Sequence, residues 1–272
     1  MSMCQTRDDV IRCRLNKMTE WAKQRRNFLD HKPGWWRDDL YIRIGGNGYT
    51  AVSLDNKSPL LGFGSGSSKN INTLERHFAK NSNGVIKPER RAQAWLIKQA
   101  LNNKVSKLDF KESLGMINND VYEKLFFALD EVSIGDKDNR PINRNDILAV
   151  GVYAGIAYPV LIELKYGHHL TGKNDLLPEL EKYATELKKF ENEFMQLLYA
   201  CIGIDVNFSS VGKIMVWPKS PNGKVSENVK KACVHNNVTL IESDTVHWLN
   251  HNDFSFHPVS KIYPPVPFVG KV

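Results

Sequence analysis

The sequence has few cysteines, no long hydrophobic segment and no leader-like N-terminus. Its four cysteines, in a chain of 272 residues, show no close pairing and are too few for a disulfide framework. One uncharged run, 147–162, has 16 residues, fewer than the roughly 20 that a membrane-spanning helix needs. Charged residues interrupt the N-terminus where a signal peptide would be apolar. We therefore expect a cytoplasmic protein that does not use a membrane.

Motifs of two common enzyme classes are also absent. The turn-rich segment 62–68 contains glycine and serine, but the chain has no GxxxxGK[ST] phosphate loop and no GxGxxG spacing. It has no G-x-S-x-G turn of the kind that serine hydrolases use. We therefore interpret 62–68 as a connector and disfavour nucleotide-binding and serine-hydrolase chemistry.

Basic residues outnumber acidic ones, and the excess is local. The chain has 37 Lys and Arg against 30 Asp and Glu, a net charge of +7. Residues 1–90 hold sixteen basic and nine acidic residues, so the whole excess lies in the first third, and 91–272 is balanced. A basic surface of this kind either attracts a polyanion or serves solubility alone, and composition leaves both readings open.

Turn signals and hydrophobic periodicity divide the chain into three parts. The first, 1–86, is a basic, partly β region, with an amphipathic helix over 6–29 and a hairpin formed by strands over 40–44 and 49–54. The last, 246–272, is an extended Pro-rich tail. The middle part, 87–245, predicts a small α/β core. Its expected elements are helices over 88–102, 120–126, 177–200 and 226–233, strand-like residues within 125–134, and strands over 146–150, 160–166, 214–217 and 238–242.

Charged residues in two of these apolar strands indicate a chemical site. In 160–166 the alternate residues are all apolar, and Glu163 and Lys165 share the other face. Burying such charges is unfavourable unless they are paired or bind a metal. Asp146 opens the preceding strand, so a hairpin would bring it to the same edge of the sheet as Glu163. Two carboxylates beside a lysine suit Mg²⁺, which prefers oxygen ligands.

The tripeptide Glu-Leu-Lys alone is weak evidence, because the chain contains it twice. The second copy, Glu186-Leu187-Lys188, falls in the predicted helix 177–200, where we expect a solvated face. Only the copy at 163–165 follows a strand that begins with an acid. The alternative for this copy is a simple ion pair between Glu163 and Lys165.

Asp146 followed by Glu163-Leu164-Lys165 resembles the PD-(D/E)xK signature of restriction endonucleases, Holliday-junction resolvases and related repair and phage-defence nucleases. The resemblance covers about 87–245 and includes the order of elements. It implies a restriction-endonuclease-like core, with a central mixed sheet flanked by helices. It also implies Mg²⁺-dependent endonuclease hydrolysis of phosphodiester bonds in DNA, with Mn²⁺ as a substitute metal and a homodimer as one candidate assembly. Asn145 stands where the family often has proline.

The resemblance also implies roles for particular residues. Asp146, Glu163 and the backbone carbonyl of Leu164 would hold one or two metal ions, and Lys165 would orient the attacking water or stabilise charge on the phosphate. An accessory acid often lies on the helix before the first core strand. Glu89, with Gln93 one turn later, occupies that place, and Glu131 is the alternative.

Other residues are candidates for contact with nucleic acid. Basic side chains near the predicted site could meet phosphates, and with Gln93 the candidates are Lys137, Arg140, Arg144, His168 and His169. Aromatic residues of the basic N-terminal region would either stack on bases or belong to the core. They are Trp35, Trp36, Tyr41 and Tyr49.

Two other functions stay open. The first is a zinc site, whose four candidate ligands have imperfect spacing: Cys233, His235, His247 and His251. The second is a non-catalytic nucleic-acid-binding or interaction protein built on a nuclease-like core, because fold alone does not specify activity.

Overall fold

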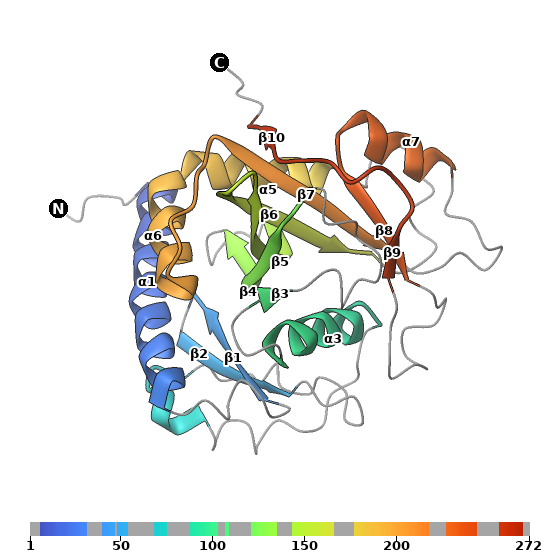
Figure 1. The fold of residues 1–272 in the computed structure, drawn as a ribbon. Coiled ribbons are helices and arrows are strands. Elements are labelled where there is room, and N and C mark those ends of the chain that lie inside the picture. Colours follow the sequence, from blue (N-terminus) through green and yellow to red (C-terminus); the bar gives the residue numbers. More distant parts are fainter. Residues whose placement is uncertain are drawn as a thin grey trace.

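The structure of the chain is a computed structural model with one mixed β-sheet at its centre and helices on both faces (Figure 1). This confirms the expected α/β class. The described residues are 6–31, 40–46, 48–53, 68–74, 88–102, 107–108, 121–134, 143–165, 177–217, 227–243 and 256–268. Among the helices in these ranges, none has the length and apolar character that a membrane crossing requires.

The sheet combines an antiparallel and a parallel half. Strands follow the order β3-β4-β5-β6-β7-β8-β9, and β10 pairs with β7. β4, β5 and β6 form an antiparallel meander, whereas β6, β7 and β8 run parallel. Their bounds are β3 (Lys107–Leu108), β4 (Lys124–Ile134), β5 (Asn143–Tyr153), β6 (Ile156–Leu164), β7 (Ser210–Trp217), β8 (Thr239–Ser243), β9 (Phe256–Pro258) and β10 (Val266–Pro267).

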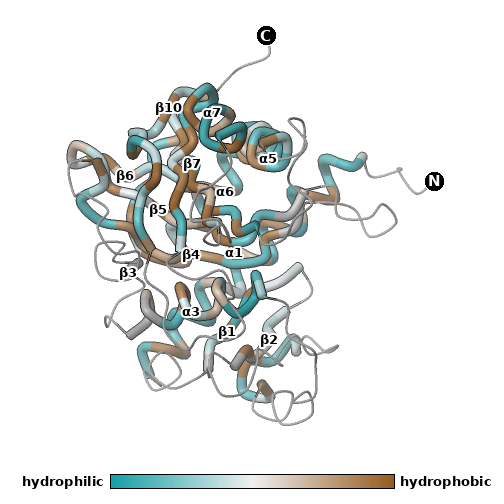
Figure 2. The backbone as a smooth tube through the Cα atoms, turned by 90° about the vertical axis from the view of Figure 1, so that its right-hand side faces the viewer, coloured by the Kyte–Doolittle hydropathy of each residue, from teal (hydrophilic) through white to brown (hydrophobic). Residues whose placement is uncertain are grey.

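Helices supply the crossovers that parallel strands require. The segment between β6 and β7 forms α5 (Pro178–Lys189) and α6 (Glu191–Ile202), and α7 (Glu227–His235) lies between β7 and β8. On the opposite face, α3 (Pro88–Asn102) packs against the sheet. In Figure 2, hydrophobic residues recur along β6 and β7, while α5 and α7 carry many hydrophilic ones.

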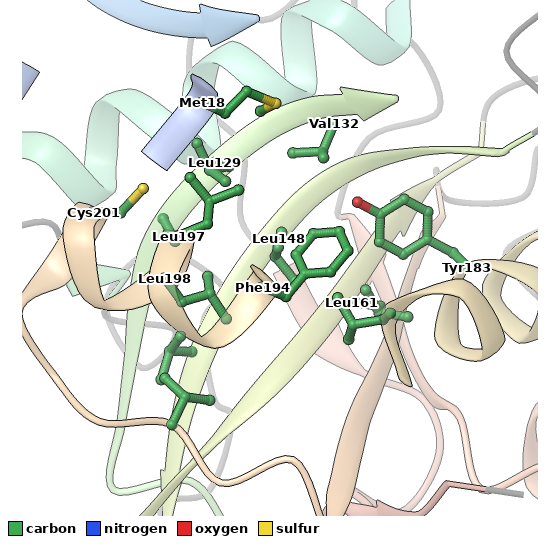
Figure 3. Close-up of a cluster of buried hydrophobic side chains, with 14 of the residues drawn as sticks. Met18, Leu129, Val132, Leu148, Leu161, Tyr183, Phe194, Leu197, Leu198 and Cys201 are labelled. Carbon is green, nitrogen blue, oxygen red and sulfur yellow. The ribbon is translucent and has the colours of Figure 1, made fainter. Parts of the chain in front are cut away.

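Residue alternation along the strands separates two cores. Leu148 and Leu161 contribute to the core beneath α5 and α6, and Figure 3 shows them close to Phe194 of α6. Ile147 and Ile162, their neighbours in sequence, belong to the core on the α3 side. Side chains at alternate strand positions thus face opposite layers, as the period of a strand requires.

The β5–β6 hairpin is longer and its turn tighter than the sequence predicts. The turn consists of Ala154 and Gly155, both with positive φ (49° and 74°), as in the turns that match strand twist. The strands expected over 146–150 and 160–166 are therefore too short on the turn side, because β-branched and aromatic residues between them extend both strands. Pro159 is tolerated in a central strand because the parallel ladder with β7 begins only at Val160.

The short helix expected over 120–126 is also wrong. Residues 121–123 are not helical, and β4 begins at Lys124. The Tyr122 ring lies over glycines of β5 and β7: a Cβ atom at Gly151 would come 2.6 Å from its Cδ1, and one at Gly212 would come 2.3 Å from its Oη. Packing of Tyr122 against residues that are distant in sequence determines the conformation of 121–123. Hydrophobic periodicity within the segment does not reveal such packing.

The long helix expected over 177–200 is two helices that meet at Phe190. This buried residue leaves the helical conformation (φ −111°, ψ 35°). Neither proline nor glycine marks the break, so the sequence pattern continues through it.

The N-terminal residues pack directly on this core. Helix α1 (Arg7–His31) lies beside α6 (Figure 1), and its buried face shares one hydrophobic cluster with the sheet. The predicted hairpin is confirmed as β1 (Leu40–Gly45) and β2 (Gly48–Ser53), and a 3-10 turn, η2 (Ile71–Thr73), follows. Tyr41 and Tyr49 are buried, so they do not act as exposed stacking platforms, and Trp35 and Trp36 lie outside the described residues.

Several charges of α1 are paired with acids and lysines of the crossover helices. Arg7 pairs with Glu186 at 3.2 Å, and Lys189 pairs with Asp8 at 2.8 Å. Arg12 pairs with Glu193, and its guanidinium lies 5.4 Å from the centre of the Phe190 ring. Part of the basic excess of the first third thus holds α1 against the rest of the protein.

A buried polar network joins α1, β1 and β4. Arg25, only 2% exposed, donates to the carbonyl oxygens of Ile42 (3.0 Å) and Ala128 (3.2 Å). Asp130 of β4 is fully buried, accepts a hydrogen bond from the Tyr41 hydroxyl (3.0 Å) and forms an ion pair with Arg43. Burial raises the pKa of Tyr41 well above its usual value, with a smaller contribution from the Asp130 charge.

Because Asp130 neutralises a buried arginine, its removal should be costly. We expect Asp130→Ala to lower the free energy of unfolding by about 3–5 kcal/mol, since it leaves Arg43 buried without this carboxylate. Urea unfolding followed by circular dichroism measures the change. Glu20→Ala, which breaks the exposed pair between Glu20 and Lys23 on α1, should cost less than about 1 kcal/mol. Equal losses for the two variants would contradict the assignment.

Candidate active site

The β5 and β6 strands separate at the end of their hairpin. Their last paired residues are Ile147 and Ile162. Beyond this pair, Asn145 continues the ladder with β4, opposite Val132, while Glu163 and Leu164 continue the ladder with β7. We call this point, with residues 145–146 of β5 and 163–165 of β6, the fork.

Side chains replace backbone pairing at the fork. The carboxylate of Asp146 accepts a hydrogen bond from the Leu164 backbone N–H (2.8 Å). The side-chain amide of Asn145 donates to the Ile162 carbonyl (3.2 Å) and, at longer range, to Oε2 of Glu163 (3.4 Å). Buried backbone groups need partners, so these two polar side chains stabilise the open end of the hairpin.

Asp146 and Glu163 face the same side of the sheet. Asp146 alternates with Leu148 along β5, and Glu163 alternates with Leu161 along β6, and both leucines lie in the core beneath α5 and α6. Glu163 is 5% exposed. Burial raises the pKa of Glu163 above its usual range, the Asp146 charge raises it further, and the nearby Lys165 ammonium opposes both effects.

Lys165 follows on the same strand face and bridges two acids. Its Nζ lies 2.8 Å from Oε1 of Glu163 and also pairs with Glu179 in the first turn of α5. Burial alone would lower the pKa of Lys165, but the charges and hydrogen bonds of Glu163 and Glu179 outweigh burial and raise it. Lys165 therefore carries its positive charge at neutral pH.

A second lysine–glutamate pair fixes α5 over the fork. Lys213 of β7 is buried, and its Nζ lies 2.6 Å from Oε1 of Glu181. The first turn of α5 is thus tied to β6 through Glu179 and to β7 through Glu181. The sequence analysis did not identify Lys213, Glu179 or Glu181 as part of the site. The available signal was Lys213 itself, a single lysine within the apolar strand 210–217.

Helix α3 supports Asp146 from the other face. Gln93 is buried, and its Nε2 donates to the backbone carbonyl of Asp146 (2.8 Å). Burial lowers the pKa of Arg90 on the same helix, and Arg43 lowers it further, while the charges of Asp146 and Glu89 oppose this. The start of α3 therefore lies near Asp146, and the observed contact of Gln93 is with the strand backbone.

Glu131, the alternative accessory acid, lies on β4 beside Asp146. The pairs Asp130–Ile147 and Val132–Asn145 flank these two residues in the register. Glu131 has a φ of 54°, a strained conformation for a residue other than glycine, of the kind that clusters at functional sites. Glu131 therefore lies at the register position across from Asp146, and Glu89 lies on the turn of α3 whose Arg90 is affected by the Asp146 charge.

Most of the predicted nucleic-acid contacts fall outside the described residues. Lys137, Arg140, His168 and His169 are in this group, as are the candidate zinc ligands His247 and His251. Arg144 belongs to β5, but only its backbone is described. Cys233 is buried in the core, and burial raises the pKa of its thiol to about 12, which disfavours the thiolate that zinc would need.

The donors at the fork fit a hard divalent cation. Asp146 and Glu163 offer carboxylate oxygens, and the Leu164 carbonyl faces the same strand edge as the Leu164 N–H that bonds Asp146. In the part of the chain that the structure describes, no group of three or more His, Cys, Asp or Glu side chains is close enough to form a metal cluster by itself. Any cation here would therefore also need backbone or amide oxygens, or water.

Comparison with known proteins gives no relative. No family model matches the chain, and no curated protein or solved structure matches it significantly.

The raised pKa of Glu163 predicts a gain in stability on neutralisation. A carboxyl whose folded pKa lies above its unfolded value destabilises the fold once the pH exceeds the unfolded value, and the loss grows up to the folded pKa. We therefore expect Glu163→Gln to raise the melting temperature of the metal-free protein, more at about pH 8 than at about pH 5.

Thermal unfolding in the presence of a chelator measures this effect. The control is Glu227→Gln, at an exposed acid that pairs with Lys230 on α7 (3.4 Å). The control should leave the melting temperature nearly unchanged at both pH values. A Glu163→Gln gain that is absent, or larger at low pH, would contradict the assignment.

Proposed function

We propose that the chain is a metal-dependent nuclease that hydrolyses phosphodiester bonds of DNA. The observation that carries the proposal is the fork, where Asp146 and Glu163 face one side of the sheet and Lys165 adjoins Glu163. Buried like charges are unfavourable without compensation. A cation bound at the fork would compensate these charges and would give the residues a role in chemistry. An ion pair between Glu163 and Lys165 would serve the fold alone.

The order of elements supports the same proposal. Helix α3, the meander β4-β5-β6, the crossover helices α5 and α6, strand β7, helix α7 and strand β8 follow the order that the PD-(D/E)xK resemblance implies. Asp146 lies near the start of the second strand of the meander, and Glu163 lies at the end of the third. We therefore propose a restriction-endonuclease-like core.

Each residue of the fork has a proposed role. Asp146, Glu163 and the Leu164 carbonyl would hold Mg²⁺ or Mn²⁺, which supplies polarisation of the scissile phosphate and a lowered pKa of bound water. Lys165, charged and flanked by Glu163 and Glu179, stabilises negative charge that develops on the phosphate or orients the attacking water. Gln93 fixes the backbone of Asp146.

The proposed partner is DNA, bound through charges near the fork. Several arginines of the N-terminal region already pair within the protein, including Arg7, Arg12 and Arg43. The charge excess of this region therefore contributes less to binding than its sum suggests. We propose a cytoplasmic role in restriction, phage defence or repair.

Cleavage of DNA tests the reaction, and the chain supplies its own matched control. We expect Mg²⁺-dependent cleavage by the wild-type protein and a loss of about 100-fold or more in Lys165→Ala and Asp146→Ala. The control is Lys188→Ala, in the second Glu-Leu-Lys tripeptide, which lies on α5, where Nζ of Lys188 donates to the Phe208 carbonyl (3.1 Å). This variant should cleave like the wild type.

The outcomes distinguish an enzyme from a binding protein. Equal cleavage by the wild type and all three variants would refute the assigned site. DNA binding without metal-dependent cleavage would favour the non-catalytic alternative.

Salt dependence tests the basic residues that precede β5 in the sequence. Replacing Lys137 and Arg140 with glutamine should weaken DNA binding uniformly across sequences, because phosphate contacts carry little sequence information. The slope of log affinity against log salt should fall by about one per lost contact. Fluorescence anisotropy at several salt concentrations measures the slope, with Lys23→Gln on α1 as control. An unchanged slope in the double variant would remove these residues from the interface.

A further inference from the structure

The side-chain amide of Asn145 has a fixed orientation at the fork. Asn145 is 1% exposed, and its Nδ2 faces two acceptors, the Ile162 carbonyl (3.2 Å) and Oε2 of Glu163 (3.4 Å). The flipped amide would turn its oxygen towards these two oxygens and would lose both hydrogen bonds. The position of Oδ1 therefore follows from the contacts of Nδ2.

This orientation leaves the amide oxygen buried without a hydrogen-bond donor. Among the described residues, Oδ1 of Asn145 accepts no hydrogen bond and is shielded from solvent. An unsatisfied buried polar atom destabilises the folded state, so its presence calls for an explanation. A leucine of similar size would have no unsatisfied oxygen, but it would lose the two hydrogen bonds that Nδ2 donates.

The groups around Asn145 indicate a cation as the missing partner. Asn145 alternates with Ile147 of the α3-side core, but its amide reaches Oε2 of Glu163 at the open end of the hairpin. Both acids of the fork, Asp146 and Glu163, face one side of the sheet. An amide oxygen is a neutral hard ligand, and proteins use it with carboxylates to bind divalent cations.

We propose that Oδ1 of Asn145 is a further ligand of the divalent cation that Asp146 and Glu163 hold. The inference rests on the proposed metal site and goes beyond it, because the PD-(D/E)xK pattern often has proline at this position and proline has no side-chain donor or acceptor. Asn145 thus serves the site twice: Nδ2 orients Glu163, and Oδ1 binds the metal. The affinity for Mn²⁺ or Mg²⁺ depends on both.

Titration of the full-length protein with Mn²⁺ by calorimetry tests the ligand role without DNA. We expect Asn145→Leu to weaken Mn²⁺ binding by about 10- to 100-fold, with Asp146→Ala as the reference for loss of the site. Loss of the Nδ2 bonds could produce part of this effect by displacing Glu163, so a second variant separates the two roles.

Asn145→Asp keeps an oxygen in place of Oδ1 but replaces the amide donor with a second oxygen. Its metal-free form should melt below the wild type, because the new carboxylate faces Glu163 and the Ile162 carbonyl. If Oδ1 is a ligand, Mn²⁺ should raise the melting temperature of this variant by more than it raises that of the wild type. If Asn145 only positions Glu163, Mn²⁺ should raise it by less, and the proposal is then wrong.

The results also separate this inference from the proposed function. Unchanged Mn²⁺ affinity in Asn145→Leu, with loss in Asp146→Ala, would overturn the role of Asn145 and leave the metal site intact. The expected Mn²⁺ effects without cleavage of DNA would support Asn145 as a ligand and refute the nuclease. An absence of Mn²⁺ binding in the wild type would overturn both.

Discussion

The separation of β5 from β6 beyond Ile147 and Ile162 is the constraint on which the rest of the site depends. A hairpin that continued its ladder would satisfy its own backbone groups and would leave no place for polar side chains. Here each strand continues with a different neighbour, β5 with β4 and β6 with β7. The freed Leu164 amide turns to Asp146, so the carboxylate is both a structural partner and the central candidate for chemistry.

Elements far apart in sequence hold the two strands in this position. On one face, Gln93 of α3 fixes the backbone of Asp146. On the other, two ion pairs tie the first turn of α5 to β6 and β7, through Glu179 and Glu181. The N-terminal network adds a third support, because Arg43 and Tyr41 of β1 hold Asp130 on β4, next to Glu131 and opposite Ile147. The first third of the chain therefore supports the core structurally.

The sequence predicts the parts of this arrangement that depend on local pattern. Alternation of apolar residues identifies the strands around Asp146 and Glu163, and a hairpin between them follows from their order, so the two acids were expected at one sheet edge. Long-range contacts produced the errors. Tyr122 packs on glycines of β5 and β7, and Phe190 ends α5 in the middle of an unbroken helical pattern. The partners of Lys165 and Lys213 on α5 also depend on how the crossover packs, which periodicity does not encode.

The distribution of buried charge distinguishes support from function. Asp130 is buried, but Arg43 and Tyr41 satisfy it, as expected of a charge that holds elements together. Glu163 has the partner Lys165 and still has a raised pKa, because burial and Asp146 outweigh that lysine. Asn145, which donates to Glu163, also has a buried oxygen without a donor among the described residues. The fork therefore combines two acids with a buried acceptor oxygen, and this is the combination of oxygen ligands that the proposed divalent cation would use.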